Sequence, residues 1–270
     1  MSNETVIMEK AVYFSSTRKL RVYDLDNYGR IYFGNEFCDE LIPSRLELQD
    51  AISIASEHRK SLSFVTCYVS EHKIKQYYAL IELLTKLIPG SEVVINDWGM
   101  LKMCFENGVE PVLGRLLVKQ KRDPRIAHFI ESLPETARLR LRQMGLNDFF
   151  LGFLRKQNIR RIELDNLLQG IDMGELRDSG FSYSVYIPYG YITTTRICFF
   201  RNRNKGVEKK FSITPCAHEC SNDVLKLDNR HMKEKLLMKG NTIFFKNSAE
   251  YFTDKGTRIN RIVYEPDIPG

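Results

Sequence analysis

The segment Ser91–Lys102 reads SEVVINDWGMLK and contains the pattern that decides the fold. Its first part, Glu92–Ile95, is a short run rich in β-branched residues, which is typical of a buried strand. Two polar residues, Asn96 and Asp97, follow at once, and Trp98–Glu106 has the apolar spacing of a helix that stops at the Asn-Gly pair behind it. The segment therefore predicts a strand that ends in polar residues and passes directly into a helix.

The same alternation continues on both sides of this segment. Ser44 with Glu47 three residues later forms a capping-box pattern, which predicts a helix to about His58. Two further helices are predicted over Ser70–Leu87 and Asn147–Lys156. The other strand candidates are Leu20–Leu25, Arg30–Phe33, Ser61–Val69, Val112–Leu117, Arg160–Leu164, Phe181–Ile187, Tyr191–Cys198, Thr242–Phe245 and Arg261–Tyr264. Strands that alternate with helices favour a parallel sheet, either doubly wound or closed into a barrel.

We therefore predict an α/β fold in the form of a TIM-like (β/α) barrel with about six to eight parallel strands, in which a helix can be missing or irregular. The sequence contains no internal repeat and no Pro- or Gly-rich linker, so we assign residues 1–270 to a single domain. Within it, residues 198–220 form a cysteine-bearing segment, and residues 221–270 form a short C-terminal α/β extension.

Composition excludes several classes of protein. The chain has 40 Lys and Arg against 34 Asp and Glu, and 43% of its residues are hydrophobic, which excludes disordered and collagen-like proteins. The longest stretch without a charged side chain, Ser179–Thr195, is shorter than the about 20 apolar residues of a membrane span and contains polar residues. The first residues contain an acid and no apolar signal core. We therefore expect a cytoplasmic protein without a membrane span.

The cysteines are the residues most typical of a cofactor site. In a reducing compartment they are thiols or metal ligands rather than disulfides. Cys216 and Cys220 form a C-x3-C, and Cys198 ends a predicted strand not far before them. Cys38 follows the predicted strand Arg30–Phe33, in a loop that a parallel barrel would place at its functional end.

The other two cysteines, Cys67 and Cys104, lie in apolar segments and fit buried core positions. Cys38, Cys198, Cys216 and Cys220 are therefore the candidate set of four thiolates. Their spacing is compatible with structural zinc and with an iron–sulfur cluster, and it does not separate the two.

The order of the motifs EVVIND, WGMLK, PVLGRLL, RRIELDN and SVYIPYGYITTTRIC resembles the collagenase-like peptidase U32 family, from about Arg30 to about Cys220. This resemblance implies a TIM-barrel-like domain. Within that family, the cysteine layout is closest to a protein of anaerobic ubiquinone hydroxylation whose four cysteines hold a [4Fe–4S] cluster. The resemblance thus implies a [4Fe–4S] cluster on the four candidate thiolates, electron transfer in an oxygen-independent hydroxylation or related modification, and a homologous protein partner.

Four other residues are candidates for contact with a small-molecule substrate, whose identity the sequence leaves open. Asp97 and Asp165 end predicted strands, where each is either a helix N-cap or a substrate contact. Arg115 lies in the otherwise apolar PVLGRLL, so its charge must be paired or functional. Arg196, two residues before Cys198, is a donor to cluster sulfur or a partner of an acid.

Three competing functions remain. A peptidase or other hydrolase is the activity in the family's name, but the sequence has no Ser-His-Asp order and no HExxH motif. An RNA-modifying protein is suggested only by the basic run Lys119, Lys121, Arg122 and Arg125, which is more typical of a solvated surface than of a nucleic-acid interface. A zinc-stabilised binding module would use the same cysteines.

Overall fold

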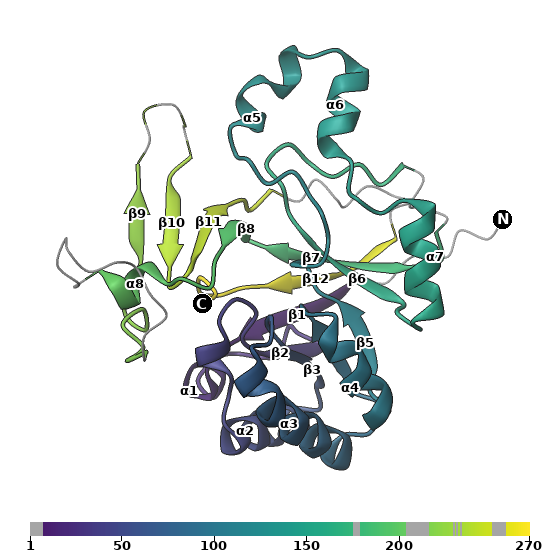
Figure 1. The fold of residues 1–270 in the computed structure, drawn as a ribbon, viewed down its shortest axis with the longest axis vertical. Coiled ribbons are helices and arrows are strands. Elements are labelled where there is room, and N and C mark those ends of the chain that lie inside the picture. Colours follow the sequence, from purple (N-terminus) through teal and green to yellow (C-terminus); the bar gives the residue numbers. More distant parts are fainter. Residues whose placement is uncertain are drawn as a thin grey trace.

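The computed structural model describes residues 8–174, 179–203, 216–228, 230, 232, 234–249 and 258–270. Its centre is a closed barrel of eight parallel strands in the order β1-β12-β7-β6-β5-β4-β3-β2 (Figure 1). The strands are β1 (Glu9–Phe14), β2 (Arg30–Gly34), β3 (Ser61–Val65), β4 (Glu92–Ile95), β5 (Glu110–Leu113), β6 (Arg161–Asp165), β7 (Ser182–Ile187) and β12 (Ile259–Tyr264). The predicted TIM-like (β/α) barrel is confirmed.

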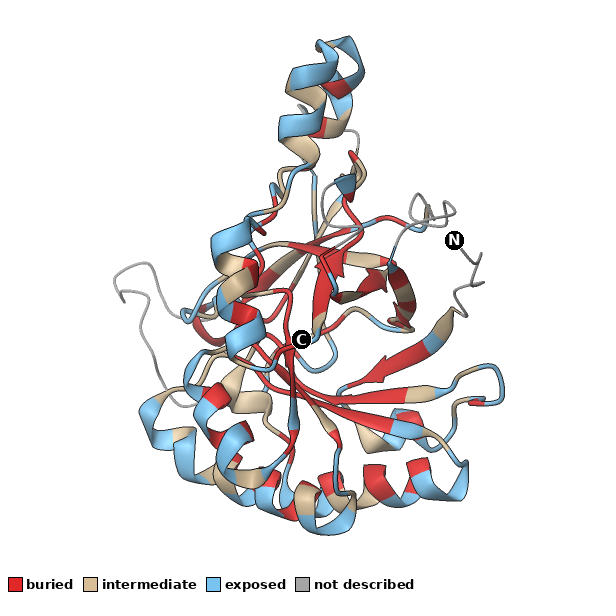
Figure 2. Ribbon diagram, turned by 90° about the vertical axis from the view of Figure 1, so that its right-hand side faces the viewer, coloured by how far each residue is buried: buried red, intermediate tan, exposed pale blue. Residues whose placement is uncertain are grey.

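Helices cover the outside of this barrel and bury apolar side chains against its strands, except at residues 135–142, where the helix has no buried residue and projects away from the barrel (Figure 2). The α-helices are α1 (Thr17–Leu20), α2 (Arg45–Glu57), α3 (Ile74–Leu87), α4 (Gly99–Asn107), α5 (Ile126–Phe129), α6 (Glu135–Arg142), α7 (Asp148–Lys156) and α8 (Phe199–Asn202). Three 3₁₀ turns are η1 (Asp39–Leu41), η2 (Glu71–Lys73) and η3 (Ile130–Ser132). None of the described residues between β6 and β7 belongs to an α-helix.

The predicted capping box at the start of α2 is present. The Glu47 amide donates to Ser44 Oγ at 3.2 Å, and the Ser44 amide donates to Glu47 Oε2 at 2.7 Å. Asn147 caps α7 in the same manner, since its Oδ1 accepts from the Phe150 amide at 2.9 Å. Side-chain caps that the local sequence provides therefore determine where both helices begin.

A small antiparallel sheet interrupts the barrel between β7 and β12. Its strands are β8 (Tyr189–Thr194), β9 (Leu225–Leu227), β10 (Leu236–Lys239) and β11 (Thr242–Lys246), in the order β8-β11-β10-β9. The predicted strand Tyr191–Cys198 thus belongs in part to this sheet and not to the barrel. Residues 221–270 are likewise not an extension that follows the barrel, because they supply three strands of the small sheet and β12, which closes the barrel.

Two apolar cores flank the barrel strands. The larger lies between strands and helices, whereas the smaller fills the barrel itself. The barrel interior also holds charged side chains in two networks, one near each end. No helix among the described residues is long and apolar enough to span a membrane.

Candidate functional site at the carboxyl end of the barrel

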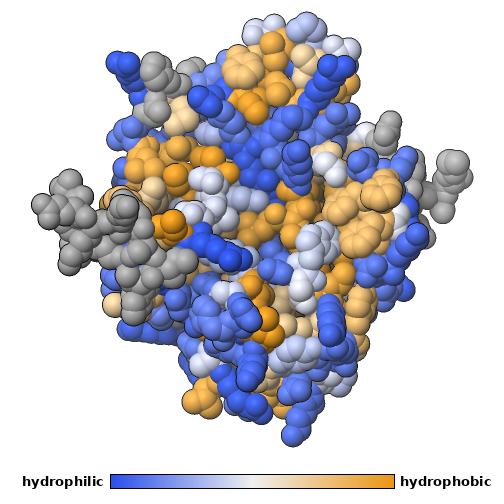
Figure 3. All heavy atoms as spheres, in the orientation of Figure 1, coloured by the Kyte–Doolittle hydropathy of each residue, from blue (hydrophilic) through white to orange (hydrophobic). Residues whose placement is uncertain are grey.

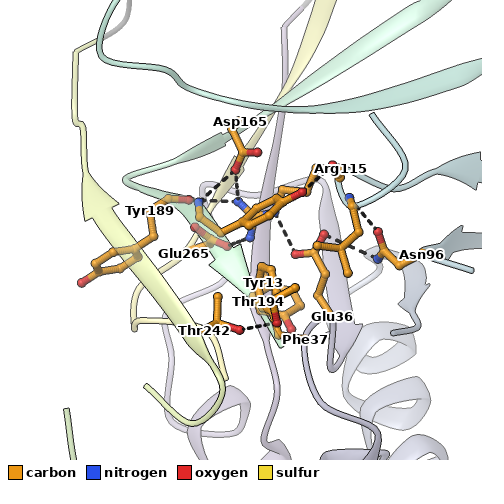
Figure 4. Close-up of polar contacts among 12 residues, drawn as sticks. Tyr13, Glu36, Phe37, Asn96, Arg115, Asp165, Tyr189, Thr194, Thr242 and Glu265 are labelled. Atoms are coloured by element: carbon orange, nitrogen blue, oxygen red, sulfur yellow. Dashed lines mark hydrogen bonds and ion pairs between the residues drawn. The ribbon is translucent and has the colours of Figure 1, made fainter. Parts of the chain in front are cut away.

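Arg115 is the centre of a buried ion-pair network at the carboxyl ends of the barrel strands (Figure 4). Its Nε lies 2.8 Å from Glu36, its Nη1 lies 3.1 Å from Asp165, and its Nη2 lies 2.5 Å from Glu265. All four side chains are fully buried. Because these residues follow or end four different strands, only the closed barrel brings them together.

The backbone at Arg115 is shaped by the glycine before it. A Cβ on Gly114 would lie 2.1 Å from Asn96 Oδ1, so only glycine lets Asn96 reach this point. The Asn96 amide then donates to the Thr66 carbonyl at 2.8 Å, and its Oδ1 accepts from the Leu116 amide at 3.1 Å. The Arg115 loop is therefore fixed against β4 as well as held by its ion pairs.

A second guanidinium, that of Arg122, completes the network. Its Nε lies 2.8 Å from Asp165, its Nη2 donates to the carbonyls of Arg115 and Val118, and its side chain stacks on the Tyr191 ring at 4.1 Å. The side chain is 9% exposed. Arg122 thus departs from the prediction that its basic run is a solvated surface.

The network holds three carboxyl groups against two guanidinium groups. Burial raises the pKa of Glu265 to about 8, against the opposing effect of Arg115, and the neighbouring charge of Glu36 adds to the rise. Burial also raises the pKa of Glu36, although Arg115 opposes this shift. A proton on Glu265 leaves two carboxylates for two guanidinium groups, so we expect Glu265 to be protonated at neutral pH. Its Oε2 has no hydrogen-bond partner among the described residues.

A cavity of about 390 Å³ lies beside this network. One wall is the segment Gln120–Arg125, and the other includes Ile192 of β8 and Leu236 of β10. Gln120 ties the wall to the network, because its Oε1 accepts from the Asp165 amide at 3.0 Å. Figure 3 shows that the surface in this view is mainly hydrophilic, with apolar residues in separate patches. The cavity is open to solvent and combines a polar wall with an apolar wall.

The four predicted ligand cysteines influence one another electrostatically, so they lie in the same region of the molecule. Burial raises the pKa of Cys38 to about 12, and the neighbouring Cys220 and Cys216 contribute to that rise. Burial likewise raises the pKa of Cys220, with contributions from Cys198 and Cys216. Such mutual effects require the thiols to be near one another, although they come from three separate segments. All six cysteines are free thiols.

The described residues form no site for a single metal ion. Among the described residues, no group of three or more His, Cys, Asp or Glu side chains could hold one metal ion. Cys67 and Cys104 are fully buried in the larger core, as predicted for structural cysteines.

Short helix α8 and turn η1 are joined beside the cysteines. The Arg201 Nη2 lies 3.0 Å from Glu40 of η1. Within the α8 segment, the side-chain Nδ2 of Asn202 donates to the Cys198 carbonyl at 2.8 Å. Burial lowers the pKa of Arg201, but a hydrogen bond to Cys216 and the charge of Glu40 raise it by more. Arg201 and Asn202 are buried, and residues 204–210 lie outside the described residues.

The remaining predicted residues are placed differently. Asp97 is outside the Arg115 network: its Oδ2 accepts from the Val69 amide at 3.1 Å and its Oδ1 from the Gly99 amide at 2.7 Å. It therefore joins two loops at a strand end. Arg196 is exposed, and its guanidinium lies 5.2 Å from the centre of the Tyr68 ring.

Sequence reasoning missed Glu36, Glu265 and Arg122. A general signal was available, because Glu36 and Glu265 each come just after a predicted strand, as Asp97 and Asp165 do. No spacing pattern in the sequence connects Glu36 or Glu265 to Arg115, because their strands are far apart in the chain.

No protein-family model matches the chain, and no curated protein matches it. Among solved structures, a U32 peptidase has a TM-score of 0.47 at 10% sequence identity, over 100% of this chain and 97% of the other. The putative copper homeostasis protein CutC from Streptococcus agalactiae has a TM-score of 0.40 at 10% identity, over 67% of this chain and 88% of the other. Both are distant likenesses, and neither identifies an activity.

Proposed function

We propose that this chain is an iron–sulfur protein in which Cys38, Cys198, Cys216 and Cys220 hold a [4Fe–4S] cluster at the carboxyl end of the barrel. The proposal is supported by the electrostatic influence of these free thiols on one another, although they come from three segments of the chain. When bound, such a cluster supplies one-electron transfer.

The surroundings of the thiols fit an anionic group. The thiol of Cys216 is among the groups that raise the pKa of Arg201, and the charge of Lys239 opposes the rise in the pKa of Cys220. Cationic side chains beside thiolates stabilise their ionised form, which is the form that binds metal. Because burial raises the pKa of Cys38, its thiol must lose a proton on binding, and we expect cluster assembly to improve as the pH rises.

We further propose that a small-molecule substrate binds in the cavity beside Arg122. Arg115, Asp165 and Arg122 form its rigid support, since each is held by at least two polar contacts. The reaction class is an oxygen-independent hydroxylation or related modification. This assignment is supported by the cysteine layout, which resembles that of UbiV, and it includes a homologous protein partner.

Anaerobic purification followed by an absorption spectrum and iron and sulfide analysis tests the cluster. We expect a brown protein with about four iron and four sulfide per chain. A colourless protein with one tightly bound zinc would contradict the proposal and favour the zinc-stabilised binding module.

Cysteine variants test the ligand set. Replacement of Cys38, Cys198, Cys216 or Cys220 by Ala should lose or degrade the cluster. The matched controls are Cys67→Ala and Cys104→Ala, which remove buried thiols of the core and should retain it. A full cluster in Cys38→Ala together with its loss in Cys104→Ala would show that the fourth ligand is misassigned.

A further inference from the structure

Asn241 occupies the turn between β10 and β11 and reaches two of the cysteine-bearing segments. Its Nδ2 lies 2.7 Å from the Phe37 carbonyl oxygen and 2.7 Å from the Thr195 carbonyl oxygen. It also lies 3.1 Å from the Tyr68 hydroxyl. Phe37 directly precedes Cys38, and Thr195 lies three residues before Cys198. One buried amide thus joins segments that are far apart in the chain.

The orientation of this amide is determined by its partners. Both carbonyl oxygens can only accept, so the NH₂ group must face them. On the other side, the Thr242 hydroxyl donates to Asn241 Oδ1 at 3.1 Å. The backbone adds a further bond, because the Thr195 amide donates to the Asn241 carbonyl at 3.1 Å. Thr195 is therefore held at both its amide and its carbonyl.

The same turn touches the third cysteine-bearing segment. Gly240, the residue before Asn241, has a φ of +58°, and a Cβ at this position would lie 3.6 Å from Cys220 Sγ. The backbone of the turn therefore lies alongside the Cys220 thiol while Asn241 holds the segments of Cys38 and Cys198.

We infer that Asn241 is a positioning residue of the cysteine site, which fixes the Cys38 and Cys198 segments relative to each other and to the turn against Cys220. The effect that we expect Asn241 to have on cluster content rests on the proposed function. The effect that we expect it to have on the distances between the thiols does not. Groups that hold metal ligands in place typically change metal affinity about 10- to 100-fold when they are removed.

The chain offers a matched control at the other end of the same strand. Asn247 is 6% exposed and Asn241 is 7% exposed. The Nδ2 of Asn247 donates to the carbonyls of Asn166 and Leu167, both at 3.2 Å. Asn247→Ala therefore removes the same type of side chain and two similar bonds, but the segment that it releases carries no cysteine.

The first experiment compares cluster content after reconstitution with limiting iron and sulfide. Asn241→Ala should retain about 10-fold less cluster than the wild type, whereas Asn247→Ala should remain within about twofold, with both variants checked for folding by urea denaturation. Asn241→Asp should be at least as deficient as Asn241→Ala, because it places a carboxylate against two carbonyl oxygens. If Asn241→Ala does not fold, Asn241→Ser keeps one donor and should show an intermediate loss.

The second experiment separates this inference from the cluster proposal. The cluster-free full chain is oxidised mildly with diamide, and disulfides between Cys38 and Cys216 or Cys220 are quantified by mass spectrometry. Their formation should be at least fivefold slower in Asn241→Ala than in Asn247→Ala, even if the wild type binds no cluster. Equal cross-linking in the two variants would overturn the inference. Equal cluster content in the two variants would also overturn it if the wild type binds a cluster.

Discussion

The two ends of the barrel interior hold two charged networks of opposite character. At the amino ends of the strands, Arg261 lies 2.6 Å from Glu9 and 2.7 Å from Glu92, and Arg30 lies 2.9 Å and 3.2 Å from the same two carboxylates. All of these residues belong to strands. At the carboxyl ends, Arg115 and three carboxyl groups are supplied in part by the loops.

The difference appears in the protonation of each network. Although burial opposes it, the hydrogen bonds and charge of Arg261 lower the pKa of Glu92 to about 2. Burial instead raises the pKa of Glu265 to about 8. At the amino end, Arg261 and Arg30 keep Glu9 and Glu92 ionised, although burial raises the pKa of the neighbouring Glu163 to about 7. The carboxyl end has a surplus of acid beside a cavity. This matches the division of TIM barrels into a stabilising amino end and a functional carboxyl end.

The largest expected effect is the loss of Arg115. Arg115→Met leaves Glu36, Asp165 and Glu265 buried with only Arg122 near them, and should lower the free energy of unfolding by about 3–5 kcal/mol. The comparison is Arg261→Met, which should cost less because Arg30 remains on both carboxylates. Urea denaturation at pH 7 measures both, and a larger loss for Arg261→Met would reverse the contrast.

The next effect concerns Glu92 and acid. Its pKa is lower in the folded state than the ordinary 4.5, so it contributes stability above about pH 4.5 and loses that contribution as the pH falls towards 2. Glu92→Gln should therefore be about 3 kcal/mol less stable than the wild type at pH 7. Urea midpoints at several acidic pH values should converge for the two proteins; a constant difference would show that the charge is not the cause.

Glu265 should show the reverse dependence. Its pKa is higher in the folded state than the ordinary 4.5, so the wild type loses stability as the pH rises from 4.5 to about 8, and the penalty is constant above that. Relative to the wild type, Glu265→Gln should gain about 2 kcal/mol between pH 6 and 8. Thermal or urea unfolding across this range gives the slope, and a flat difference would mean that Glu265 is ionised at neutral pH.

The smallest effects come from two tyrosines that link to the networks. Tyr191→Phe removes one hydrogen bond, from its hydroxyl to the Arg115 carbonyl at 3.2 Å, and should cost about 1 kcal/mol. Tyr32→Phe should cost about 2 kcal/mol, because its hydroxyl accepts from Arg261 at 2.7 Å and donates to Glu163 at 2.9 Å, both charge-assisted contacts. Chemical denaturation at pH 7 should therefore show a smaller loss of unfolding free energy for Tyr191→Phe than for Tyr32→Phe.

Much of the barrel was predictable because each βα unit is encoded locally. A run such as Glu92–Ile95 followed by Trp98–Glu106 specifies both strand and helix within a single short segment of 15 residues, and the Ser44 capping box determines the start of its own helix. The small sheet was not predictable in this way. Short apolar runs such as Thr242–Phe245 have the same pattern whether they join a barrel or an antiparallel sheet, and only tertiary pairing decides.

The candidate site was predictable only as single residues. Arg115 was conspicuous because a charge in PVLGRLL needs a partner, and Asp165 because it ends a strand. Their partners Glu36 and Glu265 come from strands distant in sequence, so no spacing rule connects them. Arg122 resembled a surface cation because its burial depends on the Tyr191 ring, which belongs to the small sheet.

The insertion of the small sheet has a consequence for synthesis of the protein on the ribosome. One edge of β1 pairs with β2, the next barrel strand in the chain. The other edge of β1 and one edge of β7 pair with β12, the last strand to be synthesised. The chain from Ile187 to Ile259, which includes three of the four candidate ligand cysteines, must emerge before either edge is covered. During that interval the nascent chain presents two unpaired parallel edges, the kind of surface on which chains aggregate. The barrel therefore cannot close before β12 has been made, and a ribosome that stalls before residue 259 leaves an open sheet whose cysteine segments have already been made.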